Sequence, residues 1–191
     1  MTISVALCPY QRARYEEEGS KGNRHIFVPW DGILTLIIPD LRSIIPSGVT
    51  VWLRITRITR QHGANALILV HPYPIWIDND YAKVHDGSLY IPATEEDMAN
   101  GFIEIQYLAM LRLKQHALAN MKTLAIYSQT QLTSTDRHPI GTNGAKKKID
   151  EYHLRSSMFA FQLVLIDEKN MAYCTDLYCN TELIQEYERK F

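Results

Sequence analysis

The stretch VTVWLRITRITR, residues 49–60, carries a clear period-two pattern. Apolar residues occupy the odd positions of 49–55, and Trp52 and Arg54 lie between them. Because successive side chains of a strand point to opposite faces, the pattern predicts a strand in which Trp52 and Arg54 share a face. The phase slips near Arg57, which we expect to mark a β-bulge or the end of sheet pairing.

Several other segments have the composition of strands bounded by turns. β-Branched and aromatic runs predict strands, and Gly, Pro, Asn and Asp between them predict turns. The predicted strands and turns are two short strands in 25–41, a buried strand in 66–77, a turn at Asp86–Gly87, a short strand LYIP (89–92), a strand TLAIYSQTQLTST (123–135), and a hairpin of SMFAFQLVLI and MAYCTDLY joined by DEKN.

Helical signals are fewer. In TEEDMANG (94–101), Thr94 can cap a helix, acidic residues fill its first turn, and Gly101 can end it. The stretch from 105 to 120 is rich in helix formers and is predicted as a helix, although alternating apolar residues in 102–114 also fit a strand. NTELIQEYERK predicts a C-terminal helix capped by Thr181.

These elements predict an α+β protein with a single β-rich domain of antiparallel strands packed with two or three helices. We expect residues 1–24 to form a flexible N-terminal arm and 25–191 to form the globular domain, since 12–24 are polar, charged and glycine-containing. Residues of about 134–150 form a long polar stretch with two glycines and a lysine triplet, which predicts a mobile loop.

Charge is arranged in bands along the chain. The net charge is −1, but residues 41–77 hold four arginines and no acid, and 78–108 hold seven acids against Lys83. Residues 109–148 hold seven bases against Asp136. A near-neutral chain banded in this way can bind copies of itself or a charged surface, unless folding intermixes the bands.

No catalytic motif is present. The chain lacks a G-x-S-x-G elbow and the spacing of a Walker phosphate loop. Cys174 and Cys179, with His153 upstream, do not have the paired spacing of a structural zinc site, and Cys8 carries no local signature of a nucleophile. The sequence therefore predicts a protein that is not an enzyme, with no metal and no cofactor.

Basic and aromatic residues are the best candidates for a binding site. A tryptophan beside arginines can stack on nucleic-acid bases or lie at a lipid interface. Lysine clusters suit the phosphate oxygens of RNA or of anionic lipids. The candidate contact residues for nucleic acid or lipid are Trp52, Arg54, Arg57, Arg60, Arg137, Lys146, Lys147 and Lys148. A half-buried sheet face and a solvated lysine tract explain the same residues without a ligand.

The C-terminal third resembles the matrix proteins of rhabdoviruses and related non-segmented negative-strand RNA viruses. The resemblance lies in the order of a strand KTLAIYSQTQL, a loop ending in KKKIDEYHLRSS, and the hairpin MFAFQLVLIDEKNMAYCTDLY. The chain lacks the PPxY and PTAP motifs that such proteins often carry. The resemblance implies a structural, self-associating virion protein that bridges the viral ribonucleoprotein and a membrane, with the lysine loop and N-terminal arm as contacts.

The expected partners are therefore a second copy of the chain, a viral nucleocapsid or its RNA, and the surface of an anionic membrane. The alternative function is an RNA-binding viral module, such as a silencing suppressor or a movement-type protein. In that case the basic sheet face and the lysine loop would bind RNA. No signal peptide and no apolar run of transmembrane length is seen, so we expect the host cytoplasm or nucleus and the virion.

Overall fold

The computed structural model describes residues 1–4, 7–11, 13–15, 33–106, 108–133 and 135–186. Within these residues the elements are β1 (Thr2–Ile3), β2 (Tyr10–Gln11), β3 (Arg14–Tyr15), β4 (Ile33–Ile37), β5 (Thr50–Ile58), β6 (Ile75–Trp76), β7 (Lys83–His85), β8 (Ser88–Pro92), α1 (Glu95–Asn100), β9 (Phe102–Gln106), β10 (Ala109–Arg112), α2 (Gln115–Asn120), β11 (Thr123–Ala125), β12 (Arg137–Pro139), α3 (Ala145–Glu151), β13 (Ser156–Ile166), β14 (Ala172–Asn180) and β15 (Ile184–Glu186).

Strand β5 lies inside the main sheet, which has the order β2-β15-β13-β5-β8-β7, with β14 also paired to β13. The strand predicted for 49–55 is therefore confirmed. Its antiparallel register with β13 runs from Thr50 opposite Ile166 to Ile58 opposite Met158 without a shift. A bulge at Arg57 is thus wrong for this pairing, whereas pairing with β8 does end just before Arg57, at Thr56.

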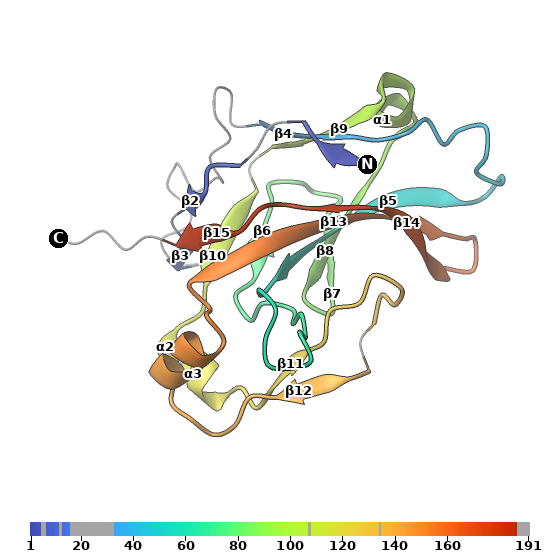
Figure 1. Ribbon diagram of the computed structural model, residues 1–191. Coiled ribbons are helices and arrows are strands. Elements are labelled where there is room, and N and C mark those ends of the chain that lie inside the picture. The colour runs from blue at the N-terminus through green and yellow to red at the C-terminus, as the bar shows by residue number, and fades with distance from the viewer. Residues whose placement is uncertain (5–6, 12, 16–32, 107, 134, 187–191) are drawn as a thin grey trace.

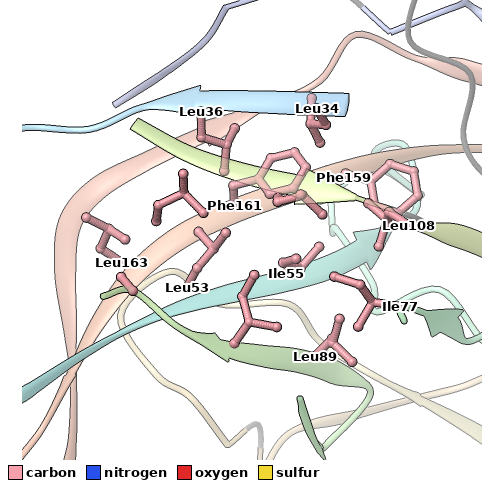
Figure 2. Close-up of a cluster of buried hydrophobic side chains, with 14 of the residues drawn as sticks. Leu34, Leu36, Leu53, Ile55, Ile77, Leu89, Leu108, Phe159, Phe161 and Leu163 are labelled. Atoms are coloured by element: carbon pink, nitrogen blue, oxygen red, sulfur yellow. The ribbon is translucent and has the colours of Figure 1, made fainter. Parts of the chain in front are cut away.

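A smaller sheet, β1-β4-β9, packs on one face of the main sheet. Figure 2 shows the apolar side chains between them, with Leu34 and Leu36 from β4 facing the odd-numbered side chains of β5 and β13. Leu53, Ile55 and Phe161 of this core have no exposed surface. Burying side chains of this size contributes about 1.5–3 kcal/mol each, so this interface is the main source of the fold's stability.

The mostly antiparallel, sheet-dominated architecture agrees with the expected β-rich fold, although the helices contribute little packing. Two pairings differ from the expectation, because β3 runs parallel to β10 and β2 runs parallel to β15. A second apolar cluster lies around α2 and α3, which are neighbours below the main sheet (Figure 1).

The local signals for α1 and for the β7–β8 turn are confirmed. Thr94 accepts a hydrogen bond from the backbone N–H of Asp97, and the Asp97 carboxylate accepts one from the backbone N–H of Thr94. This capping box satisfies two N–H groups that the helix start leaves free. Asp86 and Gly87 have φ of 45° and 74°, the left-handed geometry of a type I′ hairpin turn. The β13–β14 hairpin across DEKN is also confirmed.

The helix predicted over 105–120 is mostly wrong. Residues 102–106 and 109–112 form strands β9 and β10, and the helical part is α2 at Gln115–Asn120. The strand alternative for 102–114 is therefore the better one. Pairing with β4 and β6 decided this, since both partners lie far away in the sequence and override helix propensity.

Three further boundaries are corrected. The polar stretch 134–150 is not one long loop, because it contains β12 and the start of α3. The N-terminal arm is not free over its described part, because β1, β2 and β3 join sheets, while residues 16–24 lie outside the described residues. Residues 184–186 form strand β15 where a C-terminal helix was predicted, and 187–191 are not described.

Two of the predicted strands form only in part. In 66–77 the structure has single bridges at Leu67, Leu69 and Val70 before the two-residue β6. The strand predicted from 123 is limited to β11. Among the described residues, no helix has the length and apolar character needed to cross a membrane.

Candidate functional site

Arg57 is buried and cannot contact a nucleic acid or a membrane in this fold. Its side chain is 1% exposed and forms an ion pair with Glu186, at 2.5 Å between Nη2 and Oε1. Glu186 also accepts from Arg112 at 2.7 Å. Burial lowers the pKa of Arg57, and the carboxylate of Glu186 opposes that effect. Arg57 therefore ties β5 to β15, since a buried charge needs a partner.

Arg54 is buried as well, 3% exposed, on the opposite face of β5. Its Nη1 donates to the backbone carbonyls of Ser128 and Gln131 at 2.9 and 3.3 Å. The expected basic sheet face is thus wrong for Arg54 and Arg57, because both guanidiniums are used inside the protein. Trp52 does share the face of Arg54, and the ammonium of Lys83 lies 4.6 Å from its ring centroid.

Lys148 is the third candidate that turns inward. It lies on the buried side of α3 with no exposed surface. Its ammonium donates to the carbonyls of Leu118, at 3.2 Å, of Ala119, at 2.8 Å, and of Met121. These carbonyls end α2, where a helix leaves its last acceptors without internal partners and where its dipole favours a cation. Lys148 is therefore a C-terminal cap for a neighbouring helix.

The other four candidates are at the surface. Arg137, exposed on β12, forms an ion pair at 3.0 Å with Asp86, whose side chain is mostly buried. Lys146 and Lys147 are exposed on α3, and Arg60 is exposed just beyond β5. Of the two basic tracts identified in the sequence, the arginine tract therefore contributes Arg60 to the surface, and the lysine triplet contributes Lys146 and Lys147.

The fold brings Arg60 and α3 together. Because β5 and β13 are antiparallel with Ile58 opposite Met158, the end of β5 lies beside the start of β13. The chain enters β13 directly from α3, through His153 and Arg155. Arg60, His153 and Arg155 accordingly line one hollow, with Ile149 of α3.

A second hollow adjoins the first and shares Ile149 and Arg155 with it. It is also lined by Lys146 and by Arg112, whose guanidinium is anchored by Glu186. The hollow of Arg60 has a volume of about 300 Å³, and the hollow of Lys146 has a volume of about 210 Å³. We name this surface the α3 face and define it by Arg60, Arg112, Lys146, His153 and Arg155.

The α3 face carries more positive than negative charge. Its acids are Asp150, in the hollow of Arg60, and the buried Glu186, which two arginines already neutralise. Burial lowers the pKa of His153, and the electrostatic effects of Arg60 and His62 act in the same direction. A nearby anion would oppose this effect. The geometry therefore suits a ligand with several negative oxygen atoms.

Sequence reasoning missed Arg112 and Arg155 as members of the site. Arg112 fell inside the predicted helix of 105–120, where nothing set it apart from neighbouring bases. Arg155 is a lone arginine next to a predicted strand. The sequence offers no local signal for it. The register of β5 with β13 in the structure brings Arg155, just before β13, close to Arg60, just after β5.

Over the described part of the chain, no group of three or more His, Cys, Asp or Glu side chains could hold a metal ion. The three cysteines are free thiols, and burial raises the pKa of Cys174 and Cys179. Comparison of the sequence with models of protein families and with curated proteins finds no match, so the resemblance to viral matrix proteins stays a prediction.

Proposed function

We propose that this chain is a non-catalytic viral assembly protein of the matrix type, which binds its ribonucleoprotein through the α3 face. The observation that carries the proposal is the convergence of the two basic tracts, with Arg60 and Lys146 on adjoining hollows that share Arg155. The sequence placed these residues in separate segments, and the fold gives them a common surface.

Arginine chemistry favours RNA phosphate as the ligand of this face. Arg60 and Arg155 carry planar guanidinium groups, which match pairs of phosphate oxygens better than a lysine point charge does. Arg112, held by Glu186, lines the adjoining hollow. The two hollows also suit a nucleic-acid chain, which can enter a groove, better than they suit a flat lipid surface. Binding to anionic lipid is the other step that the matrix-type proposal includes, and it can be measured separately.

Open sheet edges support the self-association that a matrix-type protein needs. Within the described residues, β14 pairs with β13 alone and β7 pairs with β8 alone. Tyr173 and Tyr178 on β14 are 52% and 43% exposed, and Val84 on β7 is 73% exposed. Unpaired strand edges with exposed apolar side chains can pair with a second copy of the chain.

RNA binding can be tested by fluorescence anisotropy with a short single-stranded oligouridine. If Arg60, Lys146 and Arg155 each neutralise one phosphate, log K falls against log salt with a slope of about −2.1. Binding should then weaken about twentyfold between about 50 and 200 mM salt. The double variant Arg60→Glu, Lys146→Glu should reduce the slope to about −0.7.

The matched control is the double variant Lys122→Glu, Lys169→Glu. Both lysines are exposed and lie outside the two hollows, and the net charge changes equally. If the control weakens RNA binding as much as the double variant of the α3 face, binding depends on overall charge and the proposed face is wrong. If anionic vesicles capture the protein and RNA does not bind to it, the α3 face binds a membrane instead.

The alternative function, a viral RNA-binding module without a role in assembly, would use the same face. Light scattering over a range of protein concentrations separates the two. Oligomers that grow with concentration support the matrix-type protein, whereas a strict monomer that binds RNA favours the RNA-binding module.

A further inference from the structure

One cleft in the described part of the chain is separate from the α3 face. Its volume is about 870 Å³, which lies within the range of small-molecule sites. Trp52 of β5 and Tyr90 of β8 line it from the main sheet, and β7, the β13–β14 hairpin and the loop 129–133 line its sides. In Figure 1 this loop leaves β11 and passes below β14 before it reaches β12.

Buried polar side chains hold the loop in place. Arg54 donates to the carbonyls of Ser128 and Gln131, and the Gln162 side-chain amide donates to the carbonyl of Gln129 at 2.6 Å. Arg54 and Gln162 are paired across β5 and β13 and are 3% and 1% exposed. Buried polar side chains lower the stability of the fold unless they form hydrogen bonds. The bonds from Arg54 and Gln162 therefore hold the loop 129–133 against the main sheet and fix this side of the cleft.

The hydroxyl of Tyr90 has no hydrogen-bond partner among the described residues, although it is buried. Tyr90 is 7% exposed and lines the cleft. Burial raises the pKa of its hydroxyl, against the opposing effects of the Arg54 charge and the Ser88 hydroxyl. Ser88 is already bonded to Thr56 at 2.7 Å. Buried polar groups are normally paired, so the covered Tyr90 hydroxyl would gain a partner only from a ligand that reaches it past the neighbouring side chains.

We propose that this cleft binds a neutral heteroaromatic small molecule of the size and chemistry of a free nucleobase. The lining offers the aromatic rings of Trp52 and Tyr90 and a set of uncharged donors and acceptors in Gln129–Thr133. Planar rings stack on aromatic side chains, and amides and hydroxyls pair with ring nitrogens and carbonyls. A ligand that displaces the side chains over the Tyr90 hydroxyl would also give that hydroxyl a hydrogen-bond partner.

Other ligand classes fit less well. Phosphate groups need several cations, but Lys83 stacks on Trp52, and Asp176 contributes a negative charge to the same lining. A fatty-acid chain needs a continuous apolar lining, which the polar residues of 129–133 interrupt. The inference does not depend on the function of the α3 face, because the two sites share no residue.

The first test uses the unmodified protein and two-dimensional amide NMR. Adenine, decanoate and inorganic phosphate are titrated in separate experiments. Adenine should produce saturable shifts in the amides of 129–133 and of β14, while decanoate and phosphate should leave them unchanged. Absence of saturable adenine shifts at the cleft, or a stronger response to decanoate, would overturn the proposal.

The second test measures adenine affinity in two variants. Tyr90→Phe keeps the ring and should weaken binding about three- to tenfold, the effect of one hydrogen bond. Trp52→Leu should weaken it at least about fivefold, the effect of one lost stack. The controls are Tyr10→Phe and Trp76→Leu, whose residues lie outside the cleft. Unchanged affinity in both cleft variants would overturn the proposal even if adenine binds.

Discussion

Lys148 offers a direct test of how the fold uses its basic residues. The substitution Lys148→Met keeps most of the aliphatic body of the side chain and removes the ammonium group. In the structure that group donates to three carbonyls at the end of α2, those of Leu118, Ala119 and Met121. We expect the variant to fold with a lower free energy of unfolding.

The magnitude follows from two opposing contributions. Hydrogen bonds to a charged group are worth about 1.5–3 kcal/mol each, and three are lost. Because the variant no longer buries a charge, it regains several kcal/mol of the free energy of unfolding. The carbonyl of Leu118 also keeps a bond from the N–H of Met121. The expected net loss is about 2–4 kcal/mol, or a fall in Tm of roughly 5–12 °C for a chain of this size.

Chemical denaturation of Lys148→Met and of the unmodified protein measures this loss. The control is Lys147→Met, the exposed neighbour on α3, which should change stability by less than about 0.5 kcal/mol. Hydrogen exchange at the amides of α2 gives a local readout and should become faster in Lys148→Met. If both variants have the same stability, the ammonium does not support α2 and our reading of Lys148 is refuted.

Three further predictions concern stability. Glu186→Gln leaves the buried Arg57 without a counter-charge and should lower the free energy of unfolding by about 3–5 kcal/mol in urea titrations. Gly87→Ala should lower it by about 1–2 kcal/mol in thermal unfolding, since φ is +74° and the new Cβ would lie 2.7 Å from Val70. Burial holds the pKa of His71 well below 6.5. The unfolded chain therefore binds more protons below that pH, and stability should fall there by up to about 1.4 kcal/mol per pH unit, as denaturation at several pH values will measure.

Each of these has a matched control. Glu182→Gln changes an exposed carboxylate and should have little effect. Gly63→Ala has a φ of +67° but an open surrounding, so a cost equal to that of Gly87→Ala would show that Val70 does not matter. For the pH dependence, His71→Gln should flatten the acid limb and His116→Gln, at an exposed position, should not. Stability that stays level down to pH about 5.5 would contradict the reading of His71.

Features that depend on residues close in sequence could be predicted. The start and end of α1 follow from Thr94, Asp97 and Gly101, which contact one another within one helical turn. The β7–β8 turn follows from the conformational tolerance of Asp86 and Gly87. The period-two pattern of 49–55 likewise placed Trp52 and Arg54 on one face. In each case the responsible contacts, or the backbone preference itself, are local.

Features that depend on partners far away in the sequence could not be predicted. Arg57 is buried because Glu186 meets it across 129 residues of sequence, and Lys148 is buried because α2 ends beside α3. Local pattern cannot show whether a charged side chain will find such a partner, so it treated all the basic residues as surface groups. The same limit hid the polar side of the cleft, which pairs Arg54 with Gln162 from another strand.

The sequence by itself thus determined a sheet-rich chain with banded charge, because composition, alternation and turn residues act over a few positions. Tertiary structure alone decided which basic residues are buried as ion-pair partners and helix caps and which form the α3 face. The physical reason is that burial of a charge depends on the counter-charge or carbonyl that packs against it. That partner is set by strand pairing between segments far apart in the chain.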